Sequence, residues 1–160
     1  MDVDVKESYI IARFKMSNNK ISTFNAISTV TSDCVPNALY TLGAIDVVTT
    51  DIIKILIDGK GISGLECEKI FKYLFGSEFR FQTINKTVFY NYCDNELEPN
   101  NAIFCAIPGH VFLIAKRSDL TLVVLDGQNP GGIMCEIKGE DSLCWKDYKH
   151  NDYYVLTSKL

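Results

Sequence analysis

The stretch GHVFLIAKRSDLTLVVLDGQ, residues 109–128, contains two apolar runs joined by the polar segment KRSD. Apolar runs rich in Val, Ile, Leu and Phe on either side of a short polar turn are typical of a β-hairpin. If the turn centres on Ser118, His110 at the start of the first strand directly faces Asp126 at the end of the second. Directly opposed residues have Cβ atoms about 4.5–5.5 Å apart, close enough for a carboxylate to hold an imidazole. The hairpin therefore predicts a His–Asp pair.

Two glycines flank this pair. Gly109 precedes the histidine and Gly127 follows the aspartate, so the backbone can approach closely and a substrate has room. Taken alone, the stretch also fits a plain surface hairpin with a capping or solvated His and Asp.

A second stretch, TSDCVPNALYTLG (residues 31–43), places a cysteine where a helix is predicted to begin. Pro36 falls in the first turn and Gly43 after the end, the usual asymmetry of a helix. A thiol attacks as thiolate, and the unpaired N–H groups and partial positive charge of a helix N-terminus favour that anion. Cys34 is therefore a candidate nucleophile. The alternative is a small core residue, since free cysteines are among the most buried residue types.

Together these residues make a candidate triad. His110 would take the proton of Cys34 and later give a proton to the leaving group. Asp126 would hold the imidazole in one tautomer and support its charged form. His150, in the polar segment YKHND, is an alternative base, although an exposed loop histidine is the simpler interpretation.

The rest of the chain predicts helices mainly in the first half and strands in the second. Residues 49–58 favour a helix capped by Thr50 or Asp51, and a Ser63–Glu66 capping box opens a helix through about Phe75. Residues 17–23 are predicted as a polar turn and residues 93–101 as an exposed loop. This order indicates an α+β fold in a single domain, residues 1–160. The predicted strands are 7–16, 78–84, 87–92, 102–107, 110–115, 120–126, 132–137 and 153–158.

Composition narrows the function classes. The 160 residues are 47% hydrophobic and 22% charged, as in globular proteins, and carry a net charge of −4. Without clustered Lys and Arg, the sequence argues against nucleic-acid binding. No signal peptide or membrane-spanning run is evident. We therefore expect no membrane partner and a cytoplasmic location.

The six cysteines are then expected to be reduced. Cys135 and Cys144 could pair only under oxidising conditions. With no CxxC motif and two histidines, we expect no metal site and no cofactor. The segment GKGISG (59–64) matches a dinucleotide fingerprint but lacks the strand before it, and a Gly-rich connector is the better interpretation.

A cysteine that opens a helix after Asp33, a later GHVF and a strand ending in LDGQ resemble the papain-like thiol hydrolases. The pattern is most similar to papain-fold toxin domains, which pair a GHxF strand with a DGQ strand, and more loosely to bacteriocin-processing cysteine peptidases. The resemblance runs from Asp33 to Gln128. It implies a papain-like fold, in which an N-terminal helical half presents the nucleophile at a helix start and packs on a C-terminal antiparallel sheet. Cys34, His110 and Asp126 fall on the family's catalytic positions.

The resemblance assigns the three catalytic positions but does not identify the oxyanion-binding group. Relatives carry a glutamine about six residues before the cysteine, where this chain has Ser28. Asn25, the backbone N–H of Cys34, or Gln128 of the DGQ motif are the candidate donors.

The sequence thus predicts a papain-like cysteine protease or isopeptidase that acts on a protein or peptide. Ubiquitin or a ubiquitin-like modifier is a candidate partner, and a deubiquitinase-like activity would follow. A glutamine deamidase with the same triad is an alternative, and a non-catalytic binding module of the same fold is another. The Lys-, Asn- and Ile-rich composition hints at a viral or bacterial effector in a host cytosol.

Overall fold

One antiparallel sheet of eight strands organises the residues that the structure describes. The computed structural model describes residues 8–22, 24, 33–127, 135–139 and 150–160. The strands lie in the order β1-β8-β4-β5-β6-β7, with β2 paired to β4 and β3 to β8. Their bounds are Tyr9–Ile11 (β1), Phe14–Lys15 (β2), Phe79–Asn85 (β3), Asn101–Ile107 (β4), His110–Lys116 (β5), Leu122–Leu125 (β6), Cys135–Ile137 (β7) and Asp152–Lys159 (β8).

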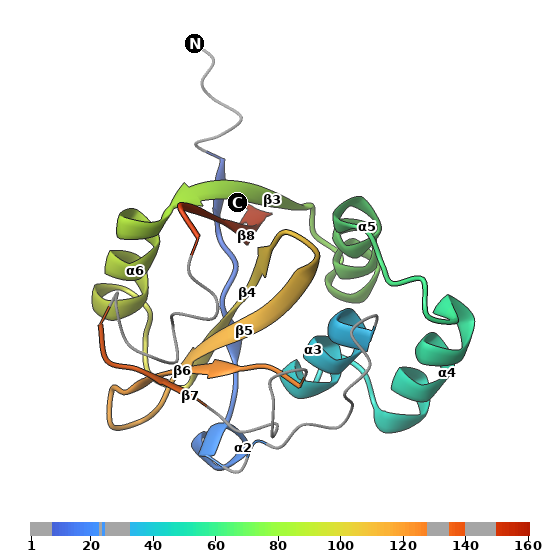
Figure 1. Ribbon diagram of the computed structural model, residues 1–160, viewed down its shortest axis with the longest axis horizontal. Helices are drawn as coiled ribbons and strands as arrows, with labels where there is room; N and C mark the ends of the chain where they lie inside the picture. Colours follow the sequence, from blue (N-terminus) through green and yellow to red (C-terminus); the bar gives the residue numbers. More distant parts are fainter. Residues whose placement is uncertain (1–7, 23, 25–32, 128–134, 140–149) are drawn as a thin grey trace.

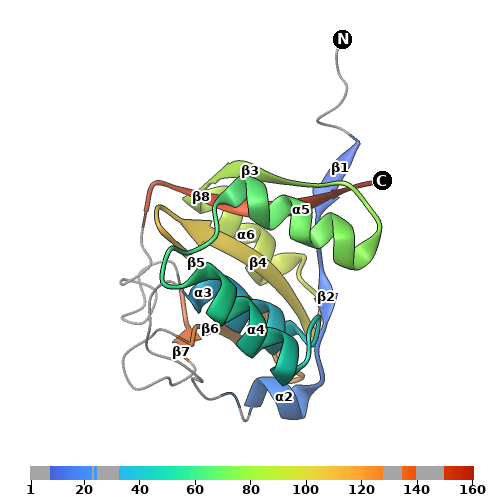
Figure 2. The same cartoon turned by 90° about the vertical axis from the view of Figure 1, so that its right-hand side faces the viewer.

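Helices cover both sides of this sheet (Figures 1 and 2). Helices α3 and α5 contribute to the core on one face, α6 packs on the other, and α4 lies outside α3. The α+β class is therefore confirmed. The helix bounds are Asn18–Ser22 (α2), Cys34–Leu42 (α3), Val47–Ile57 (α4), Gly64–Phe75 (α5) and Lys86–Asn95 (α6).

Side chains of the central strands point alternately to the two faces of the sheet and form two apolar cores. On β5, Leu113 and Ala115 face the core beneath α3 and α5, whereas Phe112 and Ile114 face the core beneath α6. Successive side chains of a strand point to opposite faces, so a continuous apolar run indicates a strand buried on both sides. The hairpin of β5 and β6 is thus the middle layer of the molecule rather than a surface hairpin.

The predicted helix starts and ends are mostly confirmed. Helix α3 begins at Cys34 and is followed by Gly43 with a left-handed φ of 79°. Helix α5 carries both hydrogen bonds of the Ser63–Glu66 capping box and ends at Phe75. Helix α4 begins earlier than predicted, because the Asp46 side chain accepts a 2.7 Å hydrogen bond from the backbone of Thr49 and caps it.

The register of the β5–β6 hairpin differs from the prediction by one residue in the turn. Leu113 pairs with Leu125, and Lys116 pairs with Leu122, so the turn centres on Asp119 rather than Ser118. The backbone N–H of Arg117 donates to the carbonyl of Thr121 at 2.9 Å and closes this longer turn. Direct opposition of His110 and Asp126 was therefore wrong, because His110 lies two positions beyond the residue opposite Asp126.

Four other predictions are corrected. Residues 87–92 belong to α6 instead of a strand, since Asn85 caps the helix and Phe89 and Cys93 bury one helical face. Residues 93–101 are not simply an exposed loop, because they include the end of α6 and the buried Leu97. The predicted turn at 17–23 contains α2, and the strand at 7–16 is split into β1 and β2. The helical half is therefore preceded and followed by strands of the same sheet.

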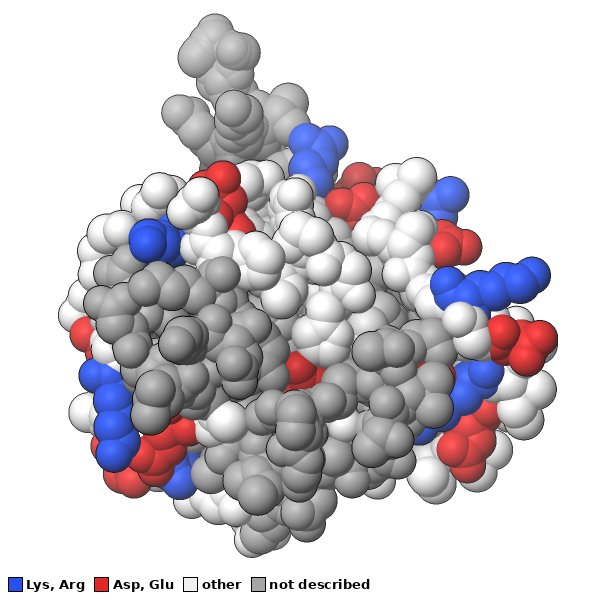
Figure 3. Space-filling view, in the orientation of Figure 1, with Lys and Arg blue, Asp and Glu red and all other residues white. Residues whose placement is uncertain are grey.

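The described residues contain no helix that is long and apolar enough to cross a bilayer. Among the described residues on the face shown in Figure 3, blue and red side chains alternate around the rim, and no broad area of these residues belongs to one sign.

Candidate functional site

Cys34 is held at the N-terminus of α3, which packs against the central sheet. Val35 and Leu39 of this helix are almost fully buried against the strands, which fixes the helix axis and its first residue. The Asp33 side chain makes no capping hydrogen bond to the helix. Backbone N–H groups at a helix N-terminus lack intrahelical partners and carry partial positive charge. The half-buried thiol therefore lies at the end of α3 that carries this partial positive charge.

His110 and Asp126 are brought together from adjacent strands. His110 is the first residue of β5, and Asp126 follows the last residue of β6. Imidazole Nε2 lies 2.5 Å from Oδ2 of Asp126, whose side chain is only 4% exposed. Diagonal neighbours across an antiparallel pair remain within reach of long side chains, which explains why the contact survives the shifted register.

The Cys34 thiol lies beside the same imidazole at the cleft, near enough to affect the pKa of the ring. Burial lowers the pKa of His110, but the hydrogen bond to Asp126, the interaction with Cys34 and the charges of both groups outweigh burial and raise it to about 9. Because Nε2 faces the carboxylate, Nδ1 is the ring nitrogen left for the sulfur. Cys34, His110 and Asp126 thus form one connected chain of proton-exchanging groups.

The other described thiols differ from Cys34. Burial raises the pKa of Cys67 to about 12. Burial likewise raises the pKa of Cys93 and Cys105 far above the ordinary thiol value. A buried thiol without a base is inert at neutral pH. Cys135 is half-buried on β7 and does not line the cleft that holds Cys34.

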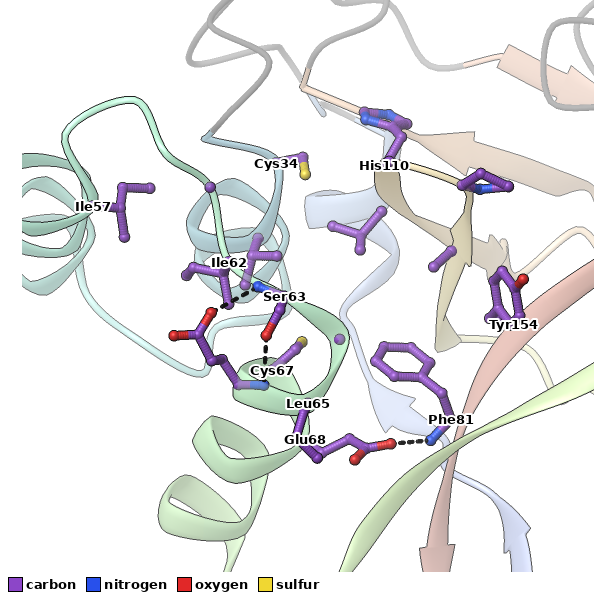
Figure 4. A pocket seen from close by; sticks show the side chains of 18 of the residues that line it. Cys34, Ile57, Ile62, Ser63, Leu65, Cys67, Glu68, Phe81, His110 and Tyr154 are labelled. Atoms are coloured by element: carbon purple, nitrogen blue, oxygen red, sulfur yellow. Dashed lines mark hydrogen bonds between the residues drawn. The ribbon is translucent and has the colours of Figure 1, made fainter.

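A cleft of about 1230 Å³ opens beside Cys34 and His110. One wall is the end of α4, the connector that contains GKGISG and the start of α5; the other is the β4–β5 turn (Figure 4). Phe81 and Tyr154 line the end of the cleft away from α4. The Glu68 carboxylate accepts the backbone N–H of Phe81 at 2.7 Å and ties α5 to β3 there. The connector therefore forms part of a cleft wall, which the sequence did not reveal.

Asn37 was missed by sequence reasoning. It lies one turn after Cys34 on α3, is 3% exposed, and packs against Gly127. A Cβ atom on Gly127 would lie 3.4 Å from Nδ2 of Asn37. Neither polar atom of this amide has a hydrogen-bond partner among the described residues. The only available signal was a polar residue on the apolar face of a helix that begins with the candidate nucleophile.

The remaining predicted site residues have different outcomes. Gly109 lines the cleft with a left-handed φ of 77° in the turn after Pro108. Asn25 and Gln128 lie outside the described residues. His150 is exposed and does not line the cleft; its backbone N–H donates to the hydroxyl of Tyr153 at 3.1 Å.

Within the described part of the chain, no three His, Cys, Asp or Glu side chains gather in a way that could hold a metal ion. Comparison with family models, with curated proteins and with solved structures finds no match to this chain. The chemistry of the site must therefore be argued from its own residues.

Proposed function

We propose that this chain is a cysteine hydrolase of papain-like arrangement, a protease or isopeptidase with Cys34, His110 and Asp126 as its triad. One observation carries the proposal: a thiol at a helix start, an imidazole and a buried carboxylate are connected in series at the side of an open cleft. A nucleophile, a base and a group that orients the base are the parts that nucleophilic acyl transfer requires.

The proposed reaction begins when His110 takes the proton of Cys34 and the thiolate sulfur attacks the carbonyl carbon of an amide. Negative charge then develops on the carbonyl oxygen, where the free N–H groups at the start of α3 supply stabilisation. The imidazolium returns its proton to the amide nitrogen, the C–N bond breaks and the amine leaves. Water then attacks the thioester, giving its proton to His110 and releasing a carboxylic acid and the Cys34 sulfur. Asp126 keeps its contact with the ring and supports the imidazolium throughout.

The volume and lining of the cleft favour a polypeptide over a single glutamine side chain. Pockets for small ligands are usually about 300–1,000 Å³, and this cleft is about 1230 Å³. Its lining is largely aliphatic and aromatic and is drawn from seven elements and the connectors between them. Such a surface suits an extended segment of a protein, cleaved at a peptide or an isopeptide bond.

The first test of this proposal is the selectivity of Cys34. At neutral pH, iodoacetamide should alkylate Cys34 before the other thiols, and peptide mapping by mass spectrometry would locate the adduct. Cys135→Ala is the matched control, because Cys135 is also half-buried but lies outside the cleft. Uniformly slow labelling would instead favour the non-catalytic binding module.

The second test is turnover. Cleavage of unfolded casein (for a protease) or adduct formation with ubiquitin bearing a C-terminal electrophile (for an isopeptidase) should occur in the wild type and be absent from Cys34→Ala, which keeps its fold by circular dichroism. Full turnover in that variant would refute the assignment of Cys34 as the nucleophile. A mass gain of about one dalton on a target protein, without chain cleavage, would assign the site to glutamine deamidation.

A further inference from the structure

Helix α4 presents an apolar side to solvent. Its inward side is made by Thr50, Ile53 and Ile57, of which only Thr50 is fully buried. The opposite side carries large aliphatic residues with high exposed fractions: Val48 62%, Ile52 50%, Ile55 75% and Leu56 76%. These positions follow the spacing i, i+4, i+7 and i+8, so they share one side of the helix. We call these four residues the α4 face.

The α4 face is not explained by the packing of the described chain. In Figure 2, α4 lies in front of α3, and no described element covers its outer side. Single exposed aliphatic residues are ordinary in a folded protein, but a contiguous apolar surface usually marks an interaction site.

The α4 face is continuous with the candidate active-site cleft. Leu56 belongs to both, because it is the last residue of the face and also lines the cleft. Leu65, 65% exposed at the start of α5, lines the same cleft rim and extends the apolar surface across the connector. A molecule whose extended segment reaches Cys34 along this rim would therefore bring its adjoining surface over α4.

We propose that the α4 face docks the folded body of a protein substrate while an extended segment of that substrate occupies the cleft. This inference rests on the proposed function. The partner is a folded protein that displays an aliphatic surface patch beside an extended segment, since an apolar face binds by burying apolar area. Ubiquitin ends in an extended C-terminal segment and serves as the probe.

The experiment compares two electrophilic probes that differ only in the folded body. One is full-length ubiquitin with a C-terminal electrophile, and the other is a peptide of its last residues with the same electrophile. Intact-mass spectrometry follows the Cys34 adduct. In the wild type, we expect the full-length probe to react about tenfold faster or more, because a few central apolar contacts dominate most interfaces. Val48→Glu and Ile52→Glu should remove most of this advantage, whereas reaction with the peptide falls less than twofold.

Val88→Glu is the matched control. Val88 is 60% exposed, as Val48 is 62% exposed, but it lies on α6, across the sheet from the cleft. This variant should leave both rates unchanged. Thermal unfolding and iodoacetamide labelling of each variant show that the fold and Cys34 are intact.

Other outcomes overturn the inference. Equal wild-type rates with the two probes, or an unchanged full-length rate in Ile52→Glu, would show that the α4 face docks no folded body. Failure of both probes while iodoacetamide still selects Cys34 would reject this partner and leave the proposed function standing. A wild-type dimer that Ile52→Glu dissociates, measured by light scattering, would assign the face to a second copy. Loss of selective labelling in the wild type would instead remove the proposed function and this inference with it.

Discussion

Replacing Asp126 with Asn should return the pKa of His110 from about 9 to its ordinary value near 6.5 or lower. The substitution keeps the size of the side chain but removes the charge that stabilises the imidazolium. Burial then lowers the pKa of His110, and only the interaction with Cys34 still raises it. The difference of about 2.5 pH units corresponds to about 3 kcal/mol. Since the imidazole is partly solvated, screening reduces this to about 2 kcal/mol.

The sign of the pH dependence follows from the raised pKa. His110 binds its proton more tightly in the folded protein than in the unfolded chain, so it contributes its full stabilisation below about pH 6.5. That contribution is lost as the pH rises through about 9. The wild type should therefore lose about 2 kcal/mol of unfolding free energy between pH 6 and pH 9.5 relative to Asp126→Asn. Urea denaturation at the two pH values measures this difference.

Direct titration gives the sharper assay. The chain has two histidines, so an NMR titration contains two imidazole signals, and His150→Gln identifies which one belongs to His110. Asp119→Asn is the control, because Asp119 lies in the turn of the same hairpin and is 66% exposed. If His110 titrates near pH 6.5 in the wild type, or if Asp126→Asn leaves its pKa unchanged, the ion-pair reasoning is refuted.

Three further substitutions test the packing around the site. Phe71→Ala should cost about 3–5 kcal/mol in urea denaturation, since Phe71 is fully buried at the centre of a cluster of aromatic rings; a loss below 1 kcal/mol would contradict this packing. Gly109→Ala should lower the unfolding free energy by about 1 kcal/mol through its left-handed φ alone, because a Cβ there meets open space; an unchanged midpoint would show that the turn relaxes. Asn37→Leu should raise the denaturation midpoint, since it replaces a buried amide that has no partner among the described residues; a strongly destabilised variant would mean that this amide is hydrogen-bonded in solution.

Local signals in the sequence were sufficient for several elements. The capping box at Ser63 and the proline–glycine asymmetry around α3 predicted helix boundaries because caps act within a few residues. The same reasoning failed for residues 87–92. There, aromatic and β-branched residues favoured a strand, but the cap at Asn85 and the burial of Phe89 and Cys93 at helical spacing prevailed.

The sequence predicted which residues form the site better than it predicted how those residues contact one another. His110 and Asp126 were paired from the hairpin pattern, but the assumed turn was one residue off, and their contact is diagonal. Asn37 and the connector wall were not foreseen, since neither carries a local motif for a site.

By itself, the sequence determined that Cys34 opens a helix, that two apolar runs form a hairpin, and that a histidine and an aspartate stand at its open end. These features depend on capping, turn chemistry and side-chain alternation, which are short-range effects. Only the tertiary structure decided that α3 sets its first residue against the imidazole and that α4 leaves an apolar side in solvent. Such placements depend on how distant segments share one core, which no local pattern encodes.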